Sequence, residues 1–174
     1  MIFAIVGPSG AGKDTLIAGA MKRRPDLRLI RRVITRPTEA GGEDFEGVTE
    51  SEFQARLAAG HFALHWQAHG LRYGIPADLL SGPGDVVFNG SRAALAAALI
   101  AFPDLQVILV TAPQAVLAER LAQRGREDQR DIRARLTRAD YALPDSISAT
   151  VVINDSTISV GVTRLLAALQ PVRA

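Results

Sequence analysis

Residues 7–14, which read GPSGAGKD, have the residue types and spacing of a loop that binds the phosphates of a nucleotide. In the pattern Gly-x-x-x-x-Gly-Lys, the glycines let backbone N–H groups point toward the phosphates, and the lysine reaches their outer oxygens. The segment follows a short apolar run and precedes a helical pattern, which is the context that the motif requires. We therefore expect Lys13 to be catalytic and the nucleotide to contact Gly7, Pro8, Ser9, Gly10, Ala11, Gly12, Lys13, Asp14 and Thr15.

Asp14 departs from this pattern, because the residue after the lysine is usually a serine or threonine whose hydroxyl ligates Mg²⁺. A carboxylate is also a hard oxygen ligand suited to Mg²⁺, and negative charge is tolerated at a helix N-terminus. The hydroxyl of Thr15 follows directly. We expect Asp14 to support Mg²⁺ directly or through water; the alternative is that it repels the phosphates and the site is inactive.

Arginines are concentrated in residues 120–138. Arg120 and Arg124 are four residues apart, which places them on one helix face, and Gly125 offers a hinge. Phosphoryl transfer needs mainly positioning and charge neutralisation, which arginines that close over phosphates supply. The alternative is a solvated helix with ion pairs to interleaved acidic residues, and we favour it for Arg126, Arg130, Arg133 and Arg138.

The bulk composition narrows the class of protein. The chain has 174 residues, 48% of them hydrophobic, which is enough for one domain with a sizeable core. There is no cysteine, so disulfides and thiolate metal sites are excluded. The formal net charge is +2 and no aromatic residues interleave with the basic ones, so nucleic acid is not an expected partner. No run is long enough for a signal peptide or a membrane span, and we expect a cytoplasmic protein.

Apolar runs alternate with helical patterns along most of the chain. The runs that indicate strands lie at residues 2–6, 28–34, 84–90, 105–112 and 148–155, and helices are predicted at about 13–23, 91–101, 113–124, 127–142 and 159–169. Such alternation predicts an α/β fold with a mostly parallel sheet covered by helices on both faces.

The stretch of about 35–84 interrupts this rhythm. It begins with a loop, continues with a helix that starts at the capping box of Thr49 and Glu52, and then reads as strand, turn and strand over residues 61–74. We interpret it as an insertion at the carboxyl ends of the strands, where ligands bind in sheets of this kind.

The motifs GPSGAGKDTL, ITRP, ESEF, RLAQRGRE and VIND resemble the guanylate kinase family of P-loop kinases over nearly the whole chain. The resemblance implies a single domain with an acceptor-binding insertion at about 35–84, an arginine-rich lid at about 124–138, and ATP with Mg²⁺ as cofactors. It also implies that phosphates are clamped by Arg120, Arg124 and Arg135, that Asn154 lies near the adenine, and that Arg36 and Tyr73 bind the acceptor phosphate.

Departures from that family concern the guanine site. Guanylate kinases carry a further arginine after ITR that holds the GMP phosphate, and this chain lacks it. The tyrosine that binds the same phosphate is replaced by Phe45. The glutamate that reads guanine falls at Leu64, and FNGSR replaces the acidic D-x-D. Without these residues, polar groups of a bound GMP would be buried without hydrogen-bond partners, which is costly. We therefore expect an acceptor other than GMP.

A narrower resemblance, carried by GPSGAGKD, ITRP, GLRYG, NGSR and RGRE, is to the ribose 1,5-bisphosphate phosphokinases of bacterial phosphonate breakdown. In that family an Asp after the lysine is usual. The resemblance implies transfer of the ATP γ-phosphoryl group to the 1-phosphate of the sugar, giving ADP and 5-phosphoribosyl 1-diphosphate (PRPP). The groups available for a sugar phosphate are Arg36, Arg72 and Arg92 for its phosphates, and His69, Asn89 and Ser91 for its hydroxyls. The alternatives are a nucleoside-monophosphate kinase of guanylate type and a non-catalytic binding module.

Overall fold

The computed structural model describes residues 1–40, 43–123 and 143–170. They form two compact units. The first consists of Met1–Ala4 and Asp26–Leu105, and the second of Ile5–Pro25 and Gln106–Ala174. We call them the first and second units below.

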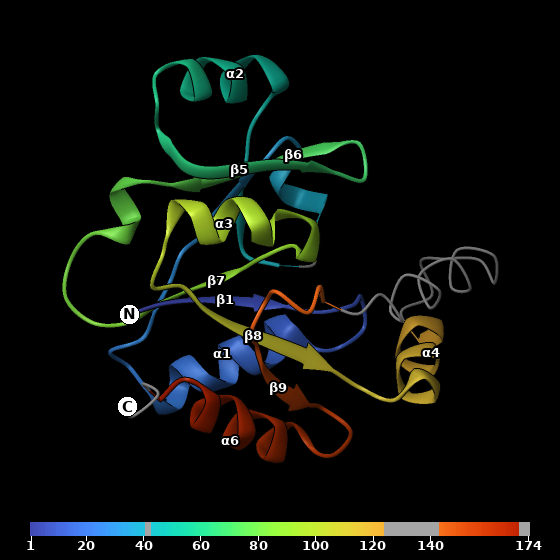
Figure 1. Ribbon diagram of the computed structural model, residues 1–174. Helices are drawn as coiled ribbons and strands as arrows, with labels where there is room; N and C mark the ends of the chain where they lie inside the picture. The colour runs from blue at the N-terminus through green and yellow to red at the C-terminus, as the bar shows by residue number, and fades with distance from the viewer. Residues whose placement is uncertain (41–42, 124–142, 171–174) are drawn as a thin grey trace. The chain divides into compact units, whose positions relative to one another are not determined.

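The second unit contains the glycine loop. Here the end of β1 (Ile2–Val6) leads through the loop into α1 (Lys13–Arg23), and the strand order is β1-β8-β9. The strand β8 (Gln106–Thr111) pairs in parallel with β9 (Thr150–Ile153). The other helices in the described part of this unit are α4 (Gln114–Gln123) and α6 (Ile158–Ala168), and α6 packs against α1 and β9 (Figure 1).

Small residues bring α1 and α6 close together. A Cβ atom on Gly19 would lie 2.4 Å from a methyl carbon of Val162, so a larger residue in α1 would push α6 away. At the outer end of the same contact, Arg23 Nη1 donates to Thr163 Oγ1 at 2.8 Å. The helix that begins at Lys13 is thereby held along its length.

The first unit contains two groups of strands. In one, β2 (Arg28–Leu29) pairs in parallel with β7 (Val86–Asn89), in the order β2-β7-β1. The other is a four-stranded sheet in the order β4-β3-β6-β5, built from β3 (Arg32–Ile34), β4 (Phe45–Gly47), β5 (Phe62–Ala68) and β6 (Leu71–Pro76). In this sheet β4 is parallel to β3, whereas β6 is antiparallel to both β3 and β5.

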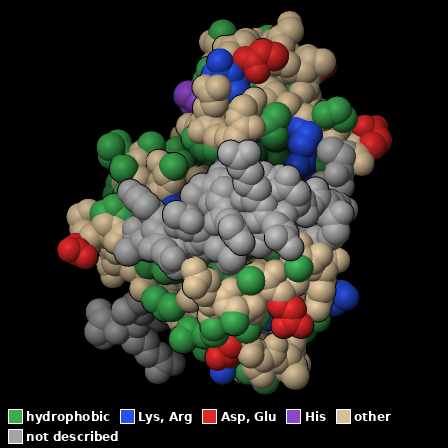
Figure 2. Space-filling view, turned by 90° about the vertical axis from the view of Figure 1, so that its right-hand side faces the viewer, with side chains coloured by type: hydrophobic (Ala, Val, Ile, Leu, Met, Phe, Trp, Pro, Cys, Tyr) green, Lys and Arg blue, Asp and Glu red, His purple; other side chains and the backbone are tan. Residues whose placement is uncertain are grey.

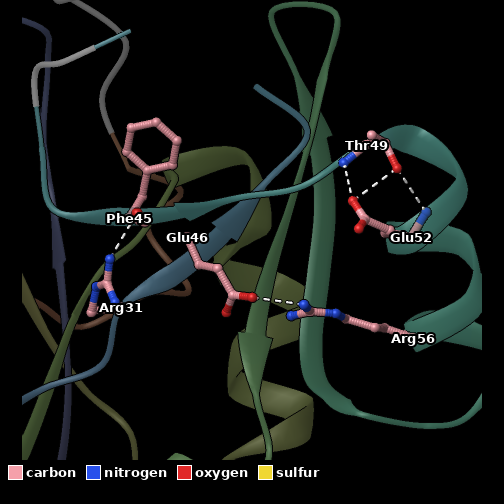
Figure 3. A network of polar contacts seen from close by, with 6 residues as sticks. All are labelled: Arg31, Phe45, Glu46, Thr49, Glu52 and Arg56. Carbon is pink, nitrogen blue, oxygen red and sulfur yellow. Dashed lines mark hydrogen bonds and ion pairs between the residues drawn. The ribbon is translucent and has the colours of Figure 1, made fainter. Parts of the chain in front are cut away.

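Two α-helices and three short 3-10 turns complete the first unit. The helices are α2 (Glu50–Ala58), which lies over β5 and β6 (Figure 1), and α3 (Leu95–Ala101); the turns are Thr38–Ala40, Asp78–Leu80 and Arg92–Ala94. The predicted capping box is confirmed, because the Glu52 amide donates to Thr49 Oγ1 at 3.2 Å and the Thr49 amide donates to Glu52 Oε2 at 2.7 Å (Figure 3).

The predicted α/β class is confirmed, with a mostly parallel sheet flanked by helices. The single strand expected at 28–34 is wrong: its first part pairs with β7, and its second part belongs to the four-stranded sheet. Residues 45–47, expected in a loop, form β4. The helix expected to start at Ser91 begins at Leu95 after a 3-10 turn, and the Ser91 side chain makes no capping bond. The helix expected at 127–142 and the lid at 124–138 lie outside the described residues.

On the face in Figure 2, acidic and basic side chains are interspersed among polar and apolar ones. Across the described ranges, none of the helices combines the length and the apolar character that crossing a membrane requires.

Candidate active site

The glycine loop has a backbone that only glycine adopts without strain at several of its positions. Gly10 and Gly12 have φ angles of 85° and 86°, in the left-handed region. A Cβ atom on Gly7 would lie 1.9 Å from the carbonyl oxygen of Val110, so the loop runs directly against β8. A Cβ atom on Gly12 would lie 2.6 Å from Asn154 Nδ2. These close approaches fix the path of the loop.

Lys13 extends back along the loop from the first residue of α1. Its ammonium donates to the carbonyl oxygens of Gly7 at 2.8 Å and Pro8 at 3.1 Å. Gly12 is the N-cap of α1, so the backbone N–H groups of the first helical turn lie beside the loop. Asp14 and Thr15 are exposed in that first turn. The lysine charge and the helix N-terminus together make a site for an anion.

Arg120, on α4, has a side-chain nitrogen for which the described residues supply no acceptor. Its Nη1 atom is buried, has no hydrogen-bond partner within the described part of the chain, and lies 4.0 Å from the place of a Cβ on Gly12. Leaving a buried cationic donor unpaired is costly. An oxygen of a nucleotide phosphate at the loop would satisfy it, so the residues present fit ATP. Arg124 and Arg135, the other expected clamps, lie outside the described residues.

Asn154 follows β9 and is 5% exposed. Its Nδ2 donates to the Ala11 carbonyl oxygen at 2.8 Å, and its own amide donates to the Thr111 carbonyl oxygen at 2.7 Å. The side chain therefore braces the glycine loop, a role that the sequence did not suggest. Its contact with adenine stays a prediction.

In the first unit, one side of the four-stranded sheet carries a cluster of aromatic and cationic residues. Trp66 and Tyr73 are cross-strand partners, and their rings stack with centroids 5.3 Å apart and planes 4° apart. The Arg32 guanidinium carbon lies 5.2 Å from the Tyr73 ring centroid and 5.9 Å from that of Trp66. Arg36 lies over Phe45 at 4.2 Å. We call this side, with Arg32, Arg36, Phe45, Trp66 and Tyr73, the tyrosine face.

Arg32 is paired with Glu43, which the sequence did not single out. Arg32 Nε donates to Glu43 Oε2 at 3.0 Å, and Nη2 contacts both oxygens of the same carboxylate. The two side chains are only 10% and 17% exposed. The sequence did contain a signal for this pair: Arg32 lies within a run that indicates a buried strand, and a buried charge requires a partner of opposite charge.

The other side of this sheet packs on α2. Phe62 stacks on Phe53 of α2 with centroids 4.6 Å apart, and a Cβ atom on Gly74 would lie 2.6 Å from the Phe62 ring. A register shift between Phe62 and Leu64 turns Phe62 to this side. Figure 3 shows the alternation on β4: the Glu46 side chain extends to Arg56 of α2, whereas the ring of Phe45 points the other way.

The expected acceptor residues are not all brought together. Arg72 alternates with Tyr73 and is paired with Glu50 of α2, with Nε and Oε1 2.5 Å apart. His69 is at the tip of the β5–β6 turn with φ of 54°. The three remaining candidates follow one another at the end of β7: Asn89 is 8% exposed, Ser91 precedes the 3-10 turn, and Arg92 begins it.

An open pocket of about 460 Å³ lies where β3 and β4 end and α2 begins. It is lined by Arg36 and Glu50, among others. The hydrogen bond from Gln54, with a further contribution from Arg72, holds the pKa of Glu50 below its usual value. Arg36 thus borders both this pocket and the tyrosine face.

On the tyrosine face, the environment of the Tyr73 phenol shifts its pKa. Burial raises its pKa and Glu43 adds to the rise, whereas Arg32 and Arg36 oppose it. Tyr73 therefore keeps its proton at neutral pH and can donate a hydrogen bond to an anion.

No family model matches the chain. Individual proteins match it well. The ribose 1,5-bisphosphate phosphokinase PhnN of Ruegeria sp. (strain TM1040) is 50% identical over 177 residues, which cover 99% of this chain and 93% of that protein. The bifunctional ribose 1,5-bisphosphokinase-thymidine phosphorylase of Azorhizobium caulinodans is 49% identical over 97% of this chain but only 25% of its own length.

A solved structure with the same fold is guanylate kinase from Anaplasma phagocytophilum, with a TM-score of 0.67 and 17% identity. The alignment covers 96% of this chain and 82% of that one. This likeness shows that the chain has the fold of that P-loop kinase. The identity to PhnN over nearly the whole chain is much higher, and the chain belongs to the ribose 1,5-bisphosphate phosphokinase family.

Proposed function

We infer that this protein is a kinase that transfers the γ-phosphoryl group of ATP to the 1-phosphate of ribose 1,5-bisphosphate. An oxygen of the 1-phosphate forms the new bond to the γ-phosphorus, the bond from that phosphorus to the β–γ bridging oxygen breaks, and ADP leaves. The product is PRPP. The observation that carries this inference is 50% identity to a ribose 1,5-bisphosphate phosphokinase over 93% of that enzyme.

ATP is proposed to bind at the glycine loop. Backbone N–H groups of the loop and of the first turn of α1 would receive the phosphates, and Lys13 and Arg120 would neutralise their charge. The buried Nη1 of Arg120 supports this placement, because it lacks an acceptor within the described ranges. Mg²⁺ would enter with ATP and neutralise charge between its phosphates, with Asp14 as an oxygen ligand directly or through water.

The acceptor is proposed to bind at the tyrosine face, through Arg36 and Tyr73. The guanidinium and the protonated phenol would both donate to a phosphate of the sugar. Because the attacking group is already a phosphate, the reaction needs no strong general base. Leu64, at the position of the guanine-reading glutamate, is 5% exposed and apolar, which disfavours a guanine acceptor.

Other groups of the first unit are proposed to contact the rest of the sugar phosphate. Arg92 would contribute charge, and Asn89 and Ser91 would contribute hydrogen bonds to hydroxyls. Arg72 and His69 remain candidates, although Arg72 is engaged by Glu50 on the α2 side. We place the reaction in the cytoplasm, as part of phosphonate catabolism, with a small sugar phosphate and no nucleic acid as partner.

The test follows ADP release with ATP and Mg²⁺, offering ribose 1,5-bisphosphate and GMP in parallel. Turnover on the sugar, with PRPP as the product and none on GMP, is expected. Turnover on GMP alone would establish a nucleoside-monophosphate kinase instead. Absence of turnover on either acceptor, with ATP still raising the unfolding temperature, would support a binding module.

A further inference from the structure

We propose that Glu43, Arg32 and Trp66 form a positioning device that fixes the hydroxyl of Tyr73 for the acceptor phosphate. The inference rests on the proposed function, in which Tyr73 binds that phosphate. None of the three residues is assigned a role by the sequence motifs. The three contact Tyr73 or each other on the tyrosine face, from β3, β5 and the segment before β4.

Arg32 has the burial and the partner of a positioning residue. Its side chain is 10% exposed, and its Nε and Nη2 are both directed to the Glu43 carboxylate. The charge is thus largely neutralised inside the protein, and the donors on Nε and Nη2 are used. What Arg32 offers to the tyrosine face is the positive charge of its guanidinium, whose carbon lies over the rings of Tyr73 and Trp66.

Tyr73 is therefore restrained from more than one side. Trp66 stacks parallel to it from β5, with ring centroids 5.3 Å apart. Arg32 covers the rings from β3, and Glu43 fixes the guanidinium plane through a two-pronged contact. A phenol held in this way loses little side-chain entropy on meeting an anion, so its hydrogen bond contributes more to binding.

The direction of the effect distinguishes positioning from simple electrostatics. Glu43 is an anion near a site that would bind an anion, and removing its charge alone would strengthen acceptor binding. If Glu43 acts by holding Arg32 and hence Tyr73, removing its charge weakens acceptor binding instead. Glu43→Gln keeps the size and part of the hydrogen bonding, so its effect on the acceptor KM reports which of the two dominates.

The experiment is a double-mutant cycle of Glu43→Gln and Tyr73→Phe, with steady-state kinetics in each of the four proteins. Either single change is expected to raise the KM for ribose 1,5-bisphosphate about tenfold, the loss of one charge-assisted hydrogen bond, with the KM for ATP within about twofold. In the Tyr73→Phe background, Glu43→Gln is expected to add less than about twofold, because its action passes through the missing hydroxyl.

Asp44→Asn is the matched control. Asp44 is the next residue and also pairs with an arginine, Arg31 Nε at 2.8 Å, but the two side chains are 64% and 51% exposed. Asp44→Asn makes the same change in charge one position away from Glu43. Because exposed ion pairs contribute little, we expect the acceptor KM of this variant to stay within about twofold of the wild-type value.

Trp66 provides a readout independent of turnover. It is the only tryptophan of the chain, so its fluorescence reports on the stack with Tyr73. Ribose 1,5-bisphosphate is expected to change the Trp66 emission in the wild type. In Glu43→Gln the same change is expected to need about tenfold more sugar.

Each failure has a separate meaning. A wild type without turnover on the sugar overturns the proposed function, and an unchanged acceptor KM in Tyr73→Phe overturns the assignment of Tyr73. With both of these intact, an unchanged or lower acceptor KM in Glu43→Gln, or effects that simply multiply in the double mutant, overturns the positioning device. If Glu43→Gln does not fold, Trp66→Phe replaces it in the cycle, because Trp66 is partly exposed and contacts Tyr73 without a buried charge.

Discussion

The side-chain amide of Asn154 donates a hydrogen bond of 2.8 Å to the carbonyl oxygen of Ala11, 143 residues earlier in the chain. The bond is buried, and it joins the end of β9 to the middle of the glycine loop. A loop of this kind binds phosphates through backbone N–H groups, so its affinity depends on the orientation of its peptide planes. We infer that Asn154 affects nucleotide binding by fixing one of those planes.

Asn154→Ala is expected to lower the free energy of unfolding by about 1–3 kcal/mol, because the Ala11 carbonyl loses its buried partner. The KM values for ATP and GTP should rise by similar factors if Asn154 braces the loop. A contact with adenine would instead raise the ATP value alone. Steady-state kinetics with each nucleotide, together with urea unfolding, separates the two roles.

Arg120→Ala is expected to lower kcat by about 100-fold or more, the range found when a group that stabilises charge in the transition state is lost. Thermal unfolding without nucleotide should occur at an unchanged or higher temperature, since the substitution removes a buried nitrogen that has no partner in the described ranges. Arg164→Ala serves as control, because Arg164 is paired with Asp155 at 2.7 Å and both side chains are partly exposed. A large loss of stability in Arg120→Ala, without a loss of kcat, would contradict a role at the phosphates.

Gly12→Ala and Gly60→Ala form a matched pair of substitutions. Their φ angles are 86° and 71°, so both variants carry the strain of a left-handed alanine, about 1–2 kcal/mol. A Cβ atom on Gly60 meets nothing within 4 Å, whereas on Gly12 it would collide with the Asn154 amide. We expect Gly60→Ala to keep the rise in unfolding temperature that ATP gives and Gly12→Ala to lose it. Equal responses to ATP in differential scanning fluorimetry would show that the close approach to Asn154 does not matter for binding.

The raised pKa of Tyr73 predicts that the protein loses stability at alkaline pH. Its pKa is raised in the folded state by burial, so the folded protein holds the phenolic proton more tightly than the unfolded chain does. This contribution to stability is fully present below the pKa of tyrosine in the unfolded chain, about 10. It is lost as the pH rises from there through the higher pKa of Tyr73 in the folded protein. Urea unfolding at several pH values should show this decline in the wild type and a smaller one in Tyr73→Phe. An equal decline in both proteins would mean that Tyr73 does not titrate in this way.

The glycine loop, the core strands and the capping box of Thr49 were predictable because each depends on neighbouring residues. The loop is a local pattern of glycines and lysine between a strand and a helix, and the box is a four-residue motif. Residues 28–34 were misassigned for the opposite reason. A run of apolar residues indicates a strand but not its pairing partner, and here the two halves of the run join different strands.

Candidate residues could be named from the sequence where a residue type has an intrinsic affinity for phosphate, as with Lys13, Arg36 and Arg120, and their roles stay predictions. They could not be named where a residue acts through contacts distant in the sequence. Glu43 is separated from Tyr73 by two strands and a helix, and only the pairing of β3 with β6 brings Arg32 to Tyr73. The sequence also did not show which face of the sheet Arg72 would occupy. That face depends on the pairing register of β6, because a shift of one residue exchanges the two faces of a strand.

The strand β6 presents Tyr73 to one side and Gly74 to the other, where the Phe62 ring occupies the space of a side chain. Neighbouring residues of β6 are thus under separate constraints: Tyr73 from the proposed recognition of the acceptor, and Gly74 from the packing of the sheet on α2. A combinatorial library that varies only the partly exposed Trp66 and Tyr73, with the α2 side left intact, would sample new acceptors with less effect on folding than one that varies the buried Arg32 or Phe45. Varying Gly74 instead would wedge α2 away and yield few folded members, whatever acceptor is offered.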